Sequence, residues 1–248
     1  MTELDPAVVA ALPLARLDYR ASVASTMDEA HALAQAGAPA GTLVLARQQL
    51  AGRGRGGRRW QSAPDAGFWG TFIERPRDAE TLTVLALRVG VALAEALEPL
   101  VDGPIGLKWP NDLLIDGGKL AGILIEARWR DGQPEWVAIG IGVNRRRPPA
   151  PVEPMALPIA TVRADVTIER LLTAIVAPVR AAAAARGLLT AAECERWAIR
   201  DAARGRWTSQ PIAGTVEGIT VAGGVRIRSD DGVVQTVQSG SLQLESVR

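Results

Sequence analysis

The chain of 248 residues is 48% hydrophobic, and its 28 Lys+Arg against 27 Asp+Glu leave a formal net charge of +1. A chain of this kind buries a sizeable core, and its charge balance argues against a generally basic nucleic-acid binder or a protein that adheres to acidic membranes. The single cysteine, Cys194, excludes an intrachain disulfide framework and suits a cytoplasmic location, and the lone His31 argues against a histidine metal cage or a Ser-His-Asp triad. We expect no signal peptide and no membrane span, because the first residues lack a cationic head and every apolar stretch is interrupted early.

The first half of the chain alternates strand-like and helix-like segments. Residues 1–16 carry no clear pattern. Thr26 and Glu29 match a capping box, which predicts a helix from Thr26 to about residue 36. Apolar residues at helical spacing predict a second helix over 82–97. Short apolar runs predict strands at 17–20, 42–48 and 67–74, and the long irregular segment before the last of them is typical of a functional loop.

The second half begins with three strand-like runs joined by tight turns. Asp116-Gly117-Gly118 precedes the second run, and Asp131-Gly132 marks the hairpin into the third. A proline-rich connection at 145–158 leads to helices that begin at Thr167 and Thr190 and end near residues 186 and 204, the second with a capping box. The strands are predicted at 105–109, 119–128 and 135–143, and again, after residue 205, at 212–216, 225–228, 233–237 and 242–247.

This order of elements predicts an α+β fold. The expected core is a mixed, mostly antiparallel sheet with helices on one face. The residue pattern changes at Gly205, where short runs of Val, Ile and Thr begin to alternate with glycine pairs. We therefore expect a catalytic or binding domain over 1–205 and a small all-β domain over 206–248.

The segment Gly52-Arg53-Gly54-Arg55-Gly56-Gly57-Arg58-Arg59-Trp60 carries the strongest chemical signal. Glycines let backbone amides converge on an anion, and the arginines add forked cationic donors suited to carboxylate or phosphate. Trp60 offers a flat apolar wall beside these charges. The alternative interpretation is a solvated Arg-Gly loop with incidental affinity for RNA.

Three further segments point to the same kind of site. In Lys108-Trp109-Pro110-Asn111-Asp112, oxygen ligands at a strand end suit Mg²⁺, although Asn-Asp after proline is also an ordinary turn. Lys119 begins a strand after a glycine turn, where it either points into a site or guards a sheet edge. The glycines of Gly140-Ile141-Gly142-Val143-Asn144 indicate close approach of a ligand or another backbone. Jointly, the segments could hold a small carboxylate beside a nucleoside triphosphate for phosphoryl or adenylyl transfer.

These four segments, in this order and spacing, resemble the biotin protein ligase family from about Ser25 to Asn144. The resemblance implies a biotin/lipoate ligase catalytic domain, related in fold to class II aminoacyl-tRNA synthetases, followed by a small SH3-like β-barrel. It implies that ATP, with Mg²⁺, activates biotin as biotinyl-5′-AMP. It also implies transfer of the biotinyl group to a lysine of a biotin carboxyl carrier protein.

The resemblance implies roles for individual residues. Those expected to contact biotin are Ser25, Thr26, Gln49, Arg53, Trp60 and Lys119. Those expected to contact the nucleotide are Arg55, Arg58, Asn111, Asp112 and Asn144. Asn111 and Asp112 are also the expected Mg²⁺ ligands, and Lys119, Asp112 and Arg53 form the expected catalytic group. An ordering of the loop at 50–67 on ligand binding would shield the reactive adenylate from water.

The sequence also departs from the family pattern. Met27 stands where the family commonly has Asn, and a thioether cannot replace the hydrogen bonds of an amide. Gly56 stands where Arg is frequent in the family. Phe68-Trp69-Gly70-Thr71 stands where the family usually begins this strand with residues of the Asn-Leu-Tyr type. These changes predict altered biotin affinity and loop stiffness rather than a different reaction.

The resemblance bears on partners as well. Bifunctional members carry a helix-turn-helix domain ahead of the ligase core, and about 20 residues precede Ser25 here, so we expect a monofunctional ligase without sequence-specific DNA binding. The family suggests a homodimer through sheet edges. The alternatives are a lipoate or octanoyl ligase or transferase on a related fold, and a non-catalytic biotin-binding or RNA-binding module. The joint presence of Asn111, Asp112 and Lys119 favours an active enzyme.

Overall fold

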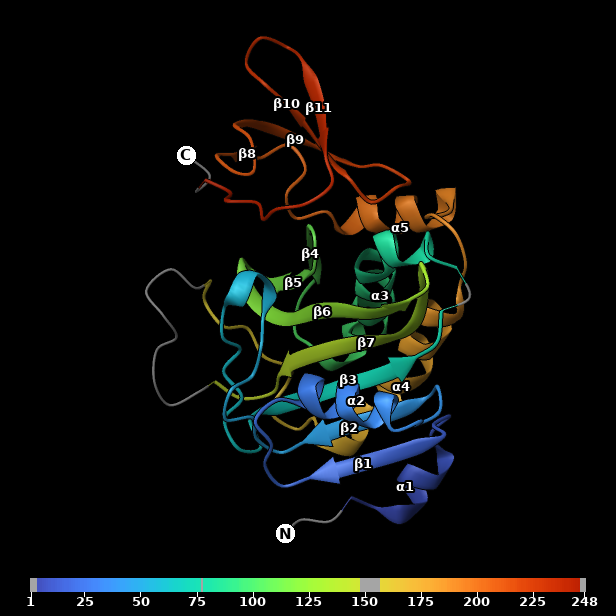
Figure 1. Ribbon diagram of the computed structural model, residues 1–248. Helices are drawn as coiled ribbons and strands as arrows, with labels where there is room; N and C mark the ends of the chain where they lie inside the picture. The colour runs from blue at the N-terminus through green and yellow to red at the C-terminus, as the bar shows by residue number, and fades with distance from the viewer. Residues whose placement is uncertain (1–3, 77, 148–156, 246–248) are drawn as a thin grey trace.

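A seven-stranded sheet forms the centre of the molecule in the computed structural model, which describes residues 4–76, 78–147 and 157–245 (Figure 1). The strand order is β1-β2-β3-β7-β6-β5-β4, and β1 pairs with β2 in parallel while the other neighbours are antiparallel. The strands are β1 (Arg16–Arg20), β2 (Thr42–Ala46), β3 (Gly67–Glu74), β4 (Gly106–Lys108), β5 (Asp112–Ile115), β6 (Gly118–Arg130) and β7 (Gln133–Asn144). The prediction of a mixed, mostly antiparallel sheet is confirmed.

Helices cover both faces of this sheet. The helices are α1 (Pro6–Ala11), α2 (Thr26–Gln35), α3 (Thr81–Leu97), α4 (Ile168–Ala184) and α5 (Ala191–Arg200). On one face, Leu43 and Phe72 belong to the large core that α3 and α4 complete. On the other, Val44 and Ile73 pack against Ala30 of α2. The expectation of helices on one face is met by α3 and α4 and is wrong for α2, because β2 and β3 are buried along their whole length and alternate side chains need cover on both sides.

The start of α2 differs from the predicted capping box. Ser25 is the N-cap, and its Oγ accepts a hydrogen bond from the amide of Met27 at 3.3 Å. Glu29 forms an ion pair with Arg20 at 3.1 Å. The capping box at Thr26 is therefore wrong, since tertiary contacts take up both side chains that would form it. The box at Thr190 is confirmed.

The remaining differences concern short elements. The unpatterned segment 1–16 contains α1, whose N-cap Asp5 accepts from the amide of Ala7 at 2.8 Å. Strand β5 was not predicted, and Asp112 begins it rather than following a strand end. Helix α5 ends at Arg200, short of residue 204, because Asp201 caps the turn that follows. Of the predicted connection at 145–158, residues 148–156 lie outside the described residues.

The C-terminal part of the chain forms a second, four-stranded antiparallel sheet that fits an SH3-like domain. Its strands, in the order β11-β10-β9-β8, are β8 (Trp207–Thr208), β9 (Gly214–Ile219), β10 (Val225–Arg228) and β11 (Val234–Val237). The predicted strand at 242–247 is reduced to a bridge between Leu244 and Thr208, and residues 246–248 lie outside the described residues. Val216 and Ile227 join the large core, and Trp109 Nε1 donates to the carbonyl of Gly223 at 2.9 Å, so the C-terminal part of the chain packs directly against the first part.

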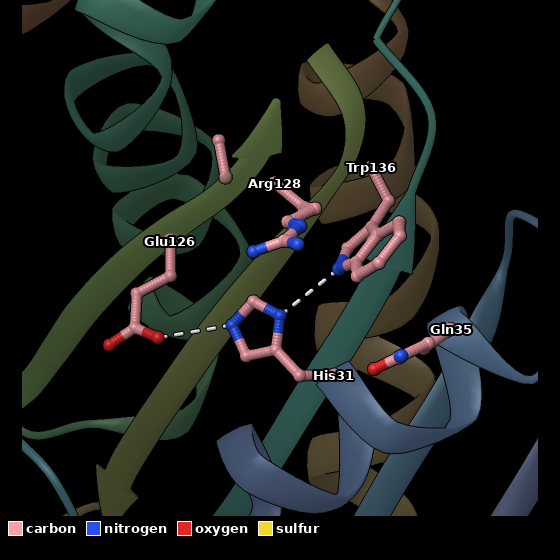
Figure 2. A pocket seen from close by; sticks show the side chains of 6 residues that line it. His31, Gln35, Glu126, Arg128 and Trp136 are labelled. Carbon is pink, nitrogen blue, oxygen red and sulfur yellow. Dashed lines mark hydrogen bonds and ion pairs between the residues drawn. The ribbon is translucent and has the colours of Figure 1, made fainter. Parts of the chain in front are cut away.

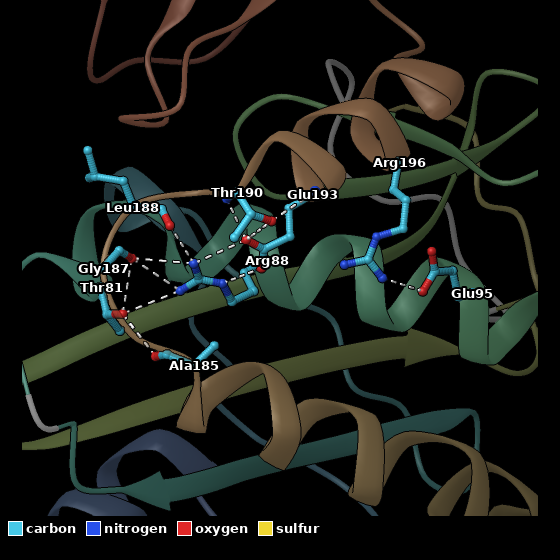
Figure 3. Close-up of polar contacts among 9 residues, drawn as sticks. All are labelled: Thr81, Arg88, Glu95, Ala185, Gly187, Leu188, Thr190, Glu193 and Arg196. Carbon is cyan, nitrogen blue, oxygen red and sulfur yellow. Dashed lines mark hydrogen bonds and ion pairs between the residues drawn. The ribbon is translucent and has the colours of Figure 1, made fainter.

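A buried ion pair joins α3 to α5 (Figure 3). Arg88 Nε lies 2.5 Å from Glu193 Oε1, and the Arg88 side chain is 4% exposed. The guanidinium also donates to the carbonyls of Gly187 and Leu188. Burial acts to raise the pKa of Glu193, but hydrogen bonds from Arg88 and Thr190 outweigh it and hold the pKa below its ordinary value. Among the helices that the structure describes, none is long and apolar enough to cross a membrane.

Candidate active site

The arginine loop, residues 50–66, folds over one end of the central sheet. Beneath it opens a cavity of about 540 Å³, lined by the loop, the first turns of α3, β6 and the turn between β4 and β5, and closed on one side by Gly223 and Gln238 of the C-terminal sheet. The motifs at 52–60 and 108–112, far apart in the sequence, thus share one cavity. Lys119, near the start of β6, reaches Asp112 beside the β4–β5 turn, and Asn144, at the end of β7, bonds to the carbonyl of Lys119.

Backbone hydrogen bonds give the arginine loop a defined hairpin shape. The amide of Gly54 donates to the carbonyl of Arg58 at 2.8 Å, and the amide of Trp60 donates to the carbonyl of Gly52 at 2.9 Å. The tip is a short 3-10 turn in which Gly56 and Gly57 have φ of 64° and 75°. Because side chains disfavour this left-handed conformation, glycine is well suited to position 56, where the resembled family often has arginine.

Trp60 covers the centre of the site. A Cβ atom on Gly142 would lie 2.5 Å from its indole ring, and one on Gly122 would lie 2.7 Å from it. The Nζ atom of Lys119 sits 4.9 Å from the ring centroid, a cation–π arrangement. The glycines do permit a close approach, but the approaching groups are side chains rather than another backbone, and the approach of a ligand stays a prediction.

Gly142→Ala is predicted to destabilise the protein and to weaken ligand binding together. The added methyl would displace Trp60, and overpacking of this kind costs ~1–3 kcal/mol. Urea denaturation measures the free energy of unfolding, and calorimetry measures the dissociation constant for biotin, the ligand that the resemblance implies. Gly90→Ala is the control, because its methyl would meet ordinary contacts at 3.7 Å. Unchanged stability in Gly142→Ala would contradict the placement of Trp60.

Lys119 and Asp112 form the closest charge pair of the site. Lys119 Nζ lies 2.6 Å from Asp112 Oδ1, with the two side chains 27% and 18% exposed. Lys108 lies nearby, and its pKa is lowered, first by burial and then by the neighbouring charges of Lys119, Arg58 and Arg206, while Asp112 opposes the shift. The site therefore concentrates positive charge around one carboxylate, as a polyphosphate requires.

The two predicted asparagines hold neighbouring segments together, and Asn111 also lines the cavity. Asn111 Nδ2 donates to the carbonyl of Ile123 at 2.7 Å, and Asn144 Nδ2 donates to the carbonyl of Lys119 at 2.9 Å. Each amide oxygen faces away from these bonds, because the nitrogen and oxygen of an amide point in different directions. Asn144 thus supports the backbone of Lys119 from the neighbouring strand.

The residues expected to contact the biotin ring system form one network at the start of α2. Gln49 Oε1 accepts from the amide and the hydroxyl of Thr26 at 2.8 and 3.0 Å, and Gln49 Nε2 donates to Ser62 Oγ at 2.7 Å. Thr26 also bonds to Thr71 at 2.9 Å. Ser25 lies beside them as the N-cap, so the structure brings together Ser25, Thr26 and Gln49.

Met27 is 3% exposed and packs over the sheet near Gly140. A Cβ on Gly140 would lie 2.7 Å from Met27 Cε. Because Gly140 and Gly142 are two residues apart in β7, Met27 and Trp60 cover the same face of that strand. The departure from the family pattern at Met27 is thus accommodated by a glycine opposite it.

The predicted arginines separate into different environments. Arg53 forms ion pairs with Asp28 at 3.0 Å and Glu126 at 2.8 Å. Burial lowers the pKa of Arg55, although Asp112 opposes the shift. Arg58 Nη2 donates to Ser241 Oγ at 3.1 Å, which connects the loop to the C-terminal part of the chain. Arg55 and Arg58 lie on the side of Asp112, whereas Arg53 lies on the side of α2.

Sequence reasoning gave no role to Lys108, Arg206 or Glu126. The sequence contains one indication for Lys108. Lys108 and Lys119 are the two lysines of the whole sequence, and every other basic side chain except His31 is an arginine. Arg206 carries no such signal, because it lies far from the motifs along the chain and reaches the site through the fold. Glu126 lies only seven residues after Lys119, but nothing in the sequence indicates that its side chain meets Arg53.

Comparison with known proteins decides the family. The family model described as the biotin/lipoate A/B protein ligase family matches residues 19–144, which is 126 of the 248 residues. The chain belongs to this family. Its match runs from β1 to the end of β7 and includes all four motifs of the site.

Similar members of the biotin/lipoate ligase family include two curated bacterial proteins. A biotin–[acetyl-CoA-carboxylase] ligase of Paracoccus denitrificans is 44% identical over 128 residues, which cover 49% of this chain and 52% of that protein. The bifunctional ligase/repressor BirA of Bacillus subtilis is 41% identical over 137 residues, 54% of this chain and 41% of that protein. The chain thus spans about half the length of these relatives.

The fold agrees with the family over nearly the whole chain. The biotin protein ligase of Aquifex aeolicus in complex with biotin and ATP superposes with a TM-score of 0.73 at 24% identity, covering 94% of this chain and 100% of that one. The fold class is therefore confirmed, including the second, C-terminal sheet.

Proposed function

We propose that this protein is an ATP-dependent biotin protein ligase. In the first step, a carboxylate oxygen of biotin would attack the α-phosphorus of ATP, forming biotinyl-5′-AMP and releasing pyrophosphate. In the second, the amine of a carrier-protein lysine would attack the acyl carbon, forming an amide and releasing AMP and a proton. The curated relative from Paracoccus denitrificans, whose name specifies biotin ligation, supports this substrate.

The observation that carries the proposal is the position of Lys119. Its ammonium group lies between Asp112 and the ring of Trp60, close to the cavity under the arginine loop. Attack by a carboxylate on a phosphate joins two anions, so the reaction needs positive charge placed in advance. Lys119 would neutralise the oxygens between the two reacting groups.

The other residues divide between the two substrates. Ser25, Thr26 and Gln49 would contact the biotin ring system beside the wall formed by Trp60, and Arg53 would bind the carboxylate. Arg55, Arg58 and Lys108 would neutralise the phosphates, and Asn144 would lie on the nucleotide side. Ordering of the arginine loop on ligand binding stays a prediction, with exclusion of water as its purpose.

The residues at the β4–β5 turn fit Mg²⁺. Asp112 Oδ1 is buried, and apart from its ion pair with Lys119 at 2.6 Å it has no hydrogen-bond partner within the described part of the chain. No cluster of three or more His, Cys, Asp or Glu occurs among the described residues, which suits a cation that takes few protein ligands and completes its shell with phosphates. Asp112 and the amide oxygen of Asn111 would hold it, and it would supply charge neutralisation on the phosphates.

The partner would be a biotin carboxyl carrier protein, in the cytoplasm, and the active form a homodimer. The chain would divide into the ligase domain, 1–205, and the SH3-like domain, 206–248. In support of this division, each part contains a sheet of its own, β1–β7 in the first and β8–β11 in the second.

One assay tests the reaction and its substrate. The protein is incubated with ATP and Mg²⁺ together with biotin, lipoate or no acid, and pyrophosphate release and labelling of a carrier domain are measured. Release and labelling with biotin alone are expected. Release with lipoate instead would favour a lipoate ligase, and release with neither acid would favour a binding module.

A further inference from the structure

Arg53, the arginine expected to bind the substrate carboxylate, is already paired with two acids. Its Nη2 atom lies 3.0 Å from Asp28 Oδ1 and 2.8 Å from Glu126 Oε2. Asp28 belongs to α2 and Glu126 to β6, so these contacts tie the arginine loop to the sheet and to the helix at once.

Glu126 does not move freely, because a chain of hydrogen bonds anchors it (Figure 2). Trp136 Nε1 donates to His31 Nδ1 at 3.0 Å, and His31 Nε2 lies 3.0 Å from Glu126 Oε2. An indole nitrogen only donates, so Nδ1 is the acceptor, and a neutral imidazole then carries its proton on Nε2, where it donates to Glu126. These side chains line an open cavity of about 480 Å³ between α2 and β6.

Arg53, Asp28 and Glu126 form a cluster whose net charge repels an anionic substrate. Arg53 contributes one positive charge, while Asp28 and Glu126 contribute two negative charges. The cluster is therefore net negative, and a carboxylate that approaches Arg53 meets repulsion as well as attraction. For substrate to bind Arg53 well, at least one of the two acids must release it.

We propose that Glu126 is a positioning residue that holds Arg53 in a resting ion pair, which the carboxylate of biotin must displace. This inference rests on the proposed function. Glu126 is the stronger of the two competitors, since its side chain is 32% exposed against 56% for Asp28 and since His31 fixes its direction. Only the molecules in which Glu126 has released Arg53 can bind the carboxylate. The apparent affinity for biotin is therefore lowered in proportion to the fraction of such molecules.

Glu126→Gln tests the inference. Calorimetric titration with biotin, without ATP, is expected to give a dissociation constant about fivefold lower than in the wild type, the scale of a partly exposed ion pair. Titration with biotin amide, which has no carboxylate to compete for Arg53, is expected to give the same constant for both proteins. A purely structural role for Glu126 would weaken or leave unchanged the binding of both ligands.

Controls make each outcome decisive. Glu135→Gln removes the same charge from the neighbouring strand, where Glu135 pairs with Arg130, and is expected to leave biotin binding unchanged. If Glu126→Gln fails to fold, the exposed Asp28→Asn replaces it, with a smaller tightening expected. Equal or weaker biotin binding in a folded variant overturns the inference, whereas absence of biotin binding in the wild type overturns the proposed function itself.

Discussion

Lys119→Ala is expected to lower the rate of pyrophosphate release by about 10²-fold or more, the scale for loss of a preorganised charge donor. The ammonium group is held between Asp112 at 2.6 Å and the Trp60 ring at 4.9 Å, so it is in place before substrate arrives. Its removal takes away the positive charge nearest to Asp112, whose carboxylate would then repel the phosphates more strongly. Both effects oppose the attack of one anion on another.

The measurement is single-turnover pyrophosphate release with ATP, Mg²⁺ and biotin. Arg130→Ala is the matched control, because it removes one positive charge from the far, exposed end of the same strand, and its rate is expected to equal that of the wild type. Thermal denaturation checks that Lys119→Ala is folded. Near-normal release by a folded variant would remove Lys119 from the catalytic group.

Arg88→Ala is expected to lower the free energy of unfolding by ~3–5 kcal/mol, the cost of leaving one partner of a buried ion pair alone. The variant would strand the Glu193 carboxylate, whose side chain is 11% exposed, and would leave the carbonyls of Gly187 and Leu188 without their donor (Figure 3). Arg196→Ala is the control on the same pair of helices, since Arg196 and Glu95 are exposed and such pairs contribute less than ~1 kcal/mol. Urea denaturation measures both.

The pH dependence of the Arg88 effect has a definite sign. The pKa of Glu193 is held below its ordinary value in the folded protein, so its contribution to stability is present above the unfolded pKa and is lost as the pH falls through the folded one. Arg88→Ala removes the largest of the interactions that lower this pKa, while the hydrogen bonds from Thr190 remain. The difference in unfolding free energy between wild type and variant should therefore shrink on acidification, and a difference that grows would contradict the account of the pair.

Local signals were read correctly from the sequence. The capping box of Thr190 and Glu193 forms as expected, because both partners lie within one turn of helix. The turns at Asp116-Gly117 and Asp131-Gly132 also form, with positive φ at all four residues. In each case, the interaction that decides the structure is made between residues a few positions apart.

The capping box expected at Thr26 failed for the opposite reason. Its hydroxyl bonds to Gln49 and Thr71, 23 and 45 residues away, and Ser25 caps the helix instead. Likewise, helix α2 lies on the second face of the sheet because β2 and β3 are buried on both sides, which short apolar runs do not reveal.

By itself, the sequence determined the four motifs of the site and the chemistry that they permit, because side-chain type sets charge, donor capacity and backbone freedom. The tertiary structure decided which of these groups meet. It set Trp60 over Gly122 and Gly142, paired Lys119 with Asp112, and turned Arg53 toward Glu126. These contacts join residues far apart in the chain, and only the packing of the loop on the sheet brings them within reach of one another.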